Sequence, residues 1–82
     1  MKVTVKRKDN SIPVVIGTEF IKLQDFLKFA NAVESGGMAK NMILNEEVTV
    51  NGEVCTMRGK KLRPGDQVVF MGVTYLVTDE TE

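Results

Sequence analysis

SGGMAKNMILNEEVTVNGE, residues 35–53, is the stretch that decides the fold. Ser35 belongs to the residue types that cap the amino ends of helices. Apolar residues recur behind it at spacings of three and four, which is the pattern of one helical face: Met38, Ala39, Met42 and Ile43. Residues 46–50 alternate as strands do, and Asn51-Gly52 is the strongest short signal for a tight hairpin. The stretch therefore predicts a short helix followed at once by a β-hairpin.

The end of this helix is expected at Asn45, because Asn tolerates the left-handed conformation that terminates many helices. The preceding segment, FIKLQDFLKFANAV at residues 20–33, predicts a longer helix with Thr18 as its cap, and residues 31–34 are expected to form a short connector to the next helix. Three phenylalanines lie in it, and we expect them to anchor the core rather than to stack on bases, since aromatics on a helical stripe usually face inward: Phe20, Phe26 and Phe29.

The two ends of the chain read as β-structure. KVTVKR and IPVVIG, joined by turn-forming residues 8–11, predict a hairpin over residues 2–17 in which Pro13 marks a strand start or a sheet edge. Residues 53–57 return from the Asn-Gly turn, residues 58–67 read as a loop with a Pro-Gly turn, and two further strands meet at Gly72. The sequence thus predicts an α+β fold, with a compact helix pair on a small, mainly antiparallel sheet and an added N-terminal hairpin.

Composition excludes several function classes. The 82 residues contain no histidine, so neither a Ser-His-Asp nor a Cys-His catalytic arrangement is available within the chain. Cys55 is the single cysteine, which rules out an internal disulfide and a cysteine-rich zinc cluster, and we interpret it as an inert strand thiol. We expect no enzyme activity, no metal and no cofactor. With no signal peptide and no apolar run of about 18 residues, we expect a cytoplasmic protein without a membrane partner.

The positive and negative charges are equal in number but are unevenly distributed along the chain. The chain has 11 basic and 11 acidic residues, yet residues 54–65 hold four basic residues and no acid, as do residues 1–8, while the C-terminal tail is acidic. A basic loop can hold a phosphate backbone by displacing counterions. It can also be an ordinary solvated loop, and lysines near strand edges can simply prevent edge-to-edge pairing.

The residues 22–53, followed by KKLRPGDQVVF at 60–70, resemble the S-four (S4) RNA-binding domain, also known by its alpha-L motif. The similarity covers about residues 20–71 and rests on a combination of short motifs: Lys22-Leu23, Phe26-Leu27, Ser35, Ala39-Lys40, Ile43, Val48-x-Val50-Asn51-Gly52 and Gly65-Asp66. The length is most similar to stand-alone small bacterial members rather than to the copies appended to pseudouridine synthases or tyrosyl-tRNA synthetases. The resemblance implies a single domain over 1–82, with a hairpin extension (1–19), an alpha-L core (20–71) and a last strand with an acidic tail (72–82).

That family uses its two helices and the adjacent hairpin to contact RNA, which implies ribosomal RNA or tRNA, and ribosomal particles, as partners. We expect the protein to be a monomer. By position, Lys22 and Lys40 match basic contacts and Ser35 matches the cap; Gly36 stands where the family commonly has Arg, and Gln24 where it commonly has Asp. The expected RNA-binding residues are Lys22, Lys28, Ser35, Gly36, Gly37, Lys40, Asn41, Arg58, Lys60, Lys61 and Arg63.

Gly36 and Gly37 leave the N–H groups at the helix start unshielded, so a phosphate could bind the backbone directly there. The alternative is that they only permit a tight turn or close helix packing. The alternative function is a protein-interaction adaptor that kept the fold with little or no RNA affinity.

Overall fold

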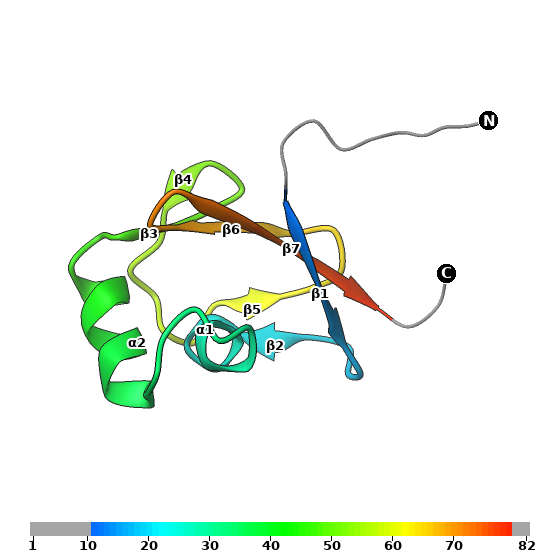
Figure 1. Ribbon diagram of the computed structural model, residues 1–82, viewed down its shortest axis with the longest axis horizontal. Coiled ribbons are helices and arrows are strands. Elements are labelled where there is room, and N and C mark those ends of the chain that lie inside the picture. Colours follow the sequence, from blue (N-terminus) through cyan, green and yellow to red (C-terminus); the bar gives the residue numbers. More distant parts are fainter. Residues whose placement is uncertain (1–10, 80–82) are drawn as a thin grey trace.

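A five-stranded mixed sheet forms one layer of the computed structural model, which describes residues 11–79 (Figure 1). Its strand order is β1-β7-β6-β3-β4, and only β1 and β7 run parallel. The strands are β1 (Ile12–Ile16), β3 (Val48–Val50), β4 (Glu53–Val54), β6 (Gln67–Phe70) and β7 (Val73–Asp79). The sheet is therefore mainly antiparallel, as predicted.

Both helices and a second, two-stranded sheet lie together beside the larger sheet (Figure 1). The helices are α1 (Leu23–Phe29) and α2 (Gly36–Leu44), and the small sheet pairs β2 (Ile21–Lys22) with β5 (Lys61–Leu62). This arrangement confirms the predicted α+β class. Among residues 11–79, no helix has the length and apolarity needed to cross a membrane.

The core lies between the helices and the larger sheet. Phe26 of α1 is fully buried and meets Tyr75 of β7 edge to face, with ring centroids 6.3 Å apart. The other fully buried large side chains come from every layer: Leu23, Leu27, Ile43, Leu62, Val48, Val68 and Val77. Their burial holds α1, α2 and β5 in fixed positions relative to the sheet.

The local predictions for residues 35–53 are confirmed with two changes, of which the first is that β3 begins at Val48 rather than at residue 46. Ser35 caps α2, since its Oγ accepts a hydrogen bond from the Met38 N–H at 3.1 Å. Asn51 and Gly52 have φ values of 52° and 89°, as a type I′ hairpin turn requires. Asn45 does end α2, but with φ −88°, and the left-handed residue is Glu46 at φ 65°.

The predicted helix is wrong at its amino end, because α1 covers Leu23–Phe29 rather than beginning at residue 20, whereas its end at Ala30, just before the predicted connector, is confirmed. Residues Ile21–Lys22 are extended instead and pair with β5, which the sequence could not show because each residue lies 39 or 41 positions from its partner. Thr18 does not cap α1; its Oγ1 donates to the carbonyl of Phe20 at 2.7 Å. The predicted loop at 58–67 is wrong in the same way, since it contains β5.

The predicted N-terminal hairpin is only partly within the described residues. Its second strand is confirmed as β1, and Pro13 lies on a strand at the edge of the described sheet. The first strand, residues 2–7, lies outside the described residues. Within residues 11–79, β1 pairs with β7, in parallel.

Candidate nucleic-acid interface

Two of the predicted lysines face each other across the small sheet. In the antiparallel register of β2 and β5, Lys22 is opposite Lys61, and Ile21 is opposite Leu62. Leu62 is fully buried and Ile21 packs against the core, whereas both lysines are exposed. Because alternate residues of a strand point to opposite faces, core packing on one face directs the two lysines to solvent on the other.

The segment before β5 is joined to the start of α1. The Leu23 N–H donates to the Lys60 carbonyl at 2.8 Å, and the Gln24 N–H donates to the Arg58 carbonyl at 3.1 Å. These bonds keep Arg58 and Lys60, both exposed, beside the amino end of α1. They also occupy two of the N–H groups with which the amino end of α1 could otherwise bind an anion.

The amino end of α2 is open by comparison. Ser35 takes the Met38 N–H, while the N–H groups of Gly36 and Gly37 have no protein acceptor among the described residues. A Cβ added at Gly36 would lie 3.5 Å from Gln24 Nε2 and 3.9 Å from Lys28 Cδ. The Lys28 side chain therefore lies against this helix end, contributed by the neighbouring helix.

The glycines are not needed for backbone conformation or for close packing. Neither Gly36 nor Gly37 has a positive φ, and an alanine Cβ would make only ordinary van der Waals contacts at either position. Lys40 follows Gly36 by four residues and so lies on the same side of α2, with exposed Asn41 next to it.

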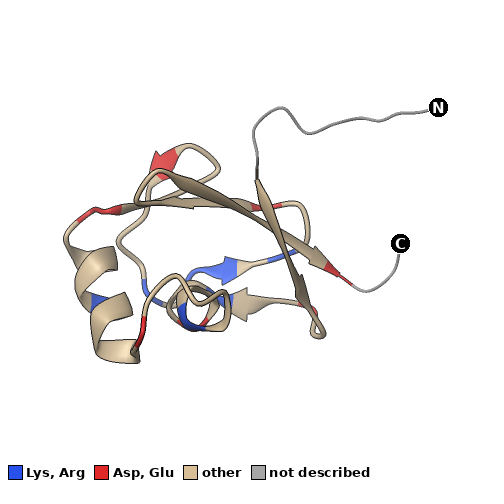
Figure 2. Cartoon of the chain, viewed as in Figure 1, with Lys and Arg blue, Asp and Glu red and all other residues tan. Residues whose placement is uncertain are grey.

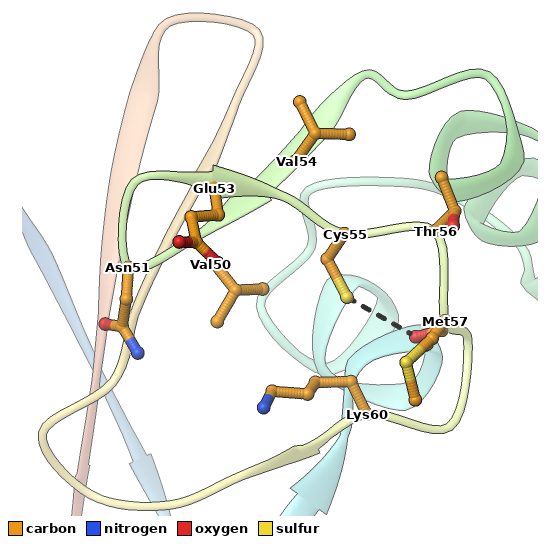
Figure 3. A pocket seen from close by; sticks show the side chains of 8 residues that line it. All are labelled: Val50, Asn51, Glu53, Val54, Cys55, Thr56, Met57 and Lys60. Carbon is orange, nitrogen blue, oxygen red and sulfur yellow. Dashed lines mark hydrogen bonds between the residues drawn. The ribbon is translucent and has the colours of Figure 1, made fainter.

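A hollow of about 480 Å³ lies between the β3–β4 hairpin and the segment that leads to β5 (Figure 3). Val50, Asn51 and Glu53 line it from the hairpin, and Met57 and Lys60 line it from the other side. The Cys55 thiol donates to the Met57 carbonyl at 3.8 Å, a weak contact within the wall of the hollow. The hollow connects the hairpin surface with the basic segment.

Charge is segregated in the described part of the chain. Figure 2 shows Lys and Arg on α1, on α2, on β5 and in the segment before β5; acidic residues lie at α1 and before α2 as well, and others mark the entry to β3 and the β4 strand. Those acids are Glu46, Glu47 and Glu53; Asp25 and Glu34 are the acids closest in sequence to the basic helix positions. The net charge of the 82 residues is zero, but β2, β5 and the segment before β5 carry a cluster of basic residues.

Two aromatic residues differ from the prediction that all three phenylalanines anchor the core. Phe26 is fully buried, but Phe29 is 57% exposed on α1. Phe20 is half-buried outside the core cluster, with its ring centroid 4.9 Å from Lys61 Nζ and 5.8 Å from Arg63 Cζ. Phe20 and Lys22 are two residues apart, which places them on the same face of a strand. The helical spacing of apolar residues in the same segment led to the prediction of a helix instead.

Comparison with known proteins agrees with this geometry. The family model described as "S4 domain" matches residues 14–78. A curated relative, the probable ribosome maturation protein RlbA of Bacillus subtilis (strain 168), is 48% identical over 60 residues, covering 73% of this chain and 84% of the relative. The solution structure of YbcJ from E. coli, said to reveal an alfaL motif involved in RNA binding, superposes with a TM-score of 0.66 at 31% identity, covering 93% of this chain and 98% of YbcJ. This protein therefore belongs to the S4-domain family.

Proposed function

We propose that this protein binds structured RNA through phosphate contacts and shape, without catalysis, and acts in ribosome maturation. Its membership in the S4-domain family supports this function, as do the name of the B. subtilis relative and the RNA-binding motif of YbcJ. Ribosomal RNA is the first candidate partner and tRNA the second. A role on ribosomal particles would place the protein in the cytoplasm. We expect it to act there as a monomer.

The observation that carries the proposal is that basic side chains from segments far apart in the sequence lie close together on one surface. Pairing of β2 with β5 sets Lys22 opposite Lys61, the bonds to α1 keep Arg58 and Lys60 beside them, and Arg63 follows on the same segment. Phosphate contacts of this kind supply most of the sequence-independent affinity for nucleic acids. Since RNA helices are recognised mainly by shape and backbone, such a surface suits a structured RNA.

The amino end of α2 would supply a second contact. The two unshielded N–H groups of Gly36 and Gly37 can bind a phosphate oxygen, and the helix dipole favours a negative charge there. Lys28 from α1 and Lys40 from α2 would add positive charge, with Ser35 and Asn41 as polar neighbours. A main-chain anion site would then replace the Arg that the family commonly has at the position of Gly36.

Binding of the purified protein to bacterial small-subunit and large-subunit ribosomal RNA, and to tRNA, at several salt concentrations tests the function. If three or four phosphates are neutralised, log affinity should fall with log salt with a slope of roughly −2 to −4. The matched control is a variant with Lys22, Lys61 and Arg63 all replaced by Gln, which should bind more weakly and with a shallower slope. No binding, or a flat salt response, would refute an electrostatic RNA interface.

One observation favours the adaptor as a second candidate function. An apolar groove of about 330 Å³ lies between α2 and the β6–β7 turn, lined by Met38, Met42, Phe70, Met71 and Tyr75 among others. Met71 is 74% exposed and Met38 is 38% exposed. Flexible, polarizable methionines at a surface groove are typical of protein-docking sites.

A further inference from the structure

The small sheet holds a like-charge pair in register. Lys22 and Lys61 are directly opposite each other, and like charges in such positions destabilise a strand pair, since their Cβ atoms are only about 5 Å apart. Phe20 lies two residues before Lys22, and Arg63 two residues after Lys61, so extended backbone brings all four side chains toward one face. Within residues 11–79, no carboxylate forms an ion pair with any of the three cations.

Phe20 restrains two of these cations. Lys61 Nζ lies over its ring at 4.9 Å and Arg63 Cζ lies at 5.8 Å, both within the range of a cation–π contact. The ring is outside the buried core cluster, so its position serves the surface of the small sheet rather than the core. Two long side chains that would otherwise sample many rotamers are thereby held next to Lys22 before any ligand arrives.

We propose that this face of β2–β5 is a preorganised phosphate clamp, in which Lys22, Lys61 and Arg63 bind neighbouring phosphates of an RNA backbone and Phe20 is the positioning residue. This clamp rests on the proposed function, because it is the contact through which the protein would bind the RNA backbone. A bound phosphate offsets the Lys22–Lys61 repulsion, which is present only while the site is empty. The clamp is separate from the amino end of α2, which uses backbone N–H groups.

Three variants separate this clamp from a purely structural role: Phe20→Leu, Phe20→Tyr and Lys22→Gln. Phe20→Leu keeps apolar bulk and all charges but removes the aromatic face, so affinity for ribosomal RNA should fall about three- to ten-fold with an unchanged salt slope. Phe20→Tyr keeps the face and should bind within about two-fold of the unchanged protein. If Phe20 had only a packing role, Phe20→Leu would lower the melting temperature, but Phe20→Leu and Phe20→Tyr would bind RNA with equal affinity.

Lys22→Gln removes one cation and the repulsion together. It should weaken RNA binding, make the salt slope shallower by about 0.7–0.9, and raise the melting temperature of the free protein by about 1–5 °C. A variant that binds RNA less well and yet melts higher is the signature of charge kept for a ligand. A lower melting temperature for Lys22→Gln would overturn the repulsion on which the clamp depends.

Failure of the clamp and failure of the function are distinguishable. If the unchanged protein binds ribosomal RNA and Phe20→Leu binds equally well, the clamp is wrong and the function stands. If the protein binds neither ribosomal RNA nor tRNA, the function fails, and the melting temperature in sodium tripolyphosphate at constant ionic strength then tests the clamp. If tripolyphosphate raises the melting temperature of the unchanged protein but not that of Lys22→Gln, the clamp is supported. If it does not raise the melting temperature of the unchanged protein, the clamp is wrong.

Discussion

The side-chain amide of Asn51 donates a hydrogen bond to the carboxylate of Asp66, with an Nδ2–Oδ1 distance of 3.2 Å. Asn51 Oδ1 also accepts from the Gln67 N–H at 2.9 Å, and Asp66 Oδ2 accepts from the Arg63 N–H at 2.8 Å. The sequence predicted Asn51 in a hairpin turn and placed Asp66 in a separate loop. Together they join the β3–β4 hairpin to the turn before β6 and fix the backbone from which Arg63 extends.

Asn51→Gly should lower the free energy of unfolding by about 1–2 kcal/mol, because two side-chain hydrogen bonds are lost. Glycine adopts the observed φ of 52° without strain, so the substitution isolates those bonds. Urea denaturation measures the change. Asn45→Gly is the matched control, since no hydrogen bond of the Asn45 side chain is recorded within residues 11–79; equal losses for both variants would contradict a role for the Asn51–Asp66 bond.

Phe26 and Phe29 form a matched pair on α1. Phe26→Ala should destabilise the protein by about 3–5 kcal/mol, because it opens a cavity where the ring is fully buried against Tyr75. Phe29→Ala should cost less than about 1 kcal/mol, since the ring is 57% exposed. Chemical denaturation of both variants checks the difference, and similar losses would mean that Phe29 is held in the core.

Replacing Gly36 and Gly37 together by Ala should leave the protein folded and at least as stable, because Ala has the higher helix propensity and the added methyl groups meet no clash. RNA affinity should fall, since the methyl groups shield the N–H groups at the start of α2. Gly59→Ala is the control: its Cβ would enter open space within the basic segment. Unchanged RNA affinity in the folded double variant would remove the helix end from the interface.

Met71→Asp separates the two candidate functions. Asp is tolerated at positive φ, and Met71 has φ 55° with 74% exposure, so the fold should be unaffected. If the protein acts through RNA, Met71→Asp should bind purified ribosomal RNA within about two-fold of the unchanged protein, apart from a small effect of one added negative charge. If Met71→Asp abolishes binding to intact ribosomal particles and Lys22→Gln does not, the result would favour the protein adaptor.

Local signals predicted the parts of the fold that need only neighbouring residues. The Ser35 cap and the Asn51-Gly52 turn each depend on contacts within a few positions, and the structure confirms them. Of the predicted apolar face of α2, Ala39 and Ile43 are buried, whereas Met38 is exposed. The same reasoning failed at residues 20–22, because pairing with Lys61–Leu62 outweighed a helical spacing that continued across them. No nearby residue indicates a partner that distant in the chain.

The candidate interface was predicted in composition but not in geometry. The basic residues of 58–63 were identified, yet their meeting with Lys22 depends on the β2–β5 register, and the contact of Lys28 with the start of α2 depends on how the helices pack. Phe20 was assigned to the core because its spacing fits a helix. Its contact with Lys61 and Arg63 follows only once that segment is a strand.

Ultraviolet crosslinking in cells, followed by sequencing of the RNA attached to the protein, tests the proposed role most directly. The protein should carry fragments of ribosomal RNA that map to a confined region. The variant with Lys22, Lys61 and Arg63 replaced by Gln should recover far less of them at equal protein level. Recovery of no RNA above background, or equal recovery by the variant, would contradict an RNA interface on β2 and β5.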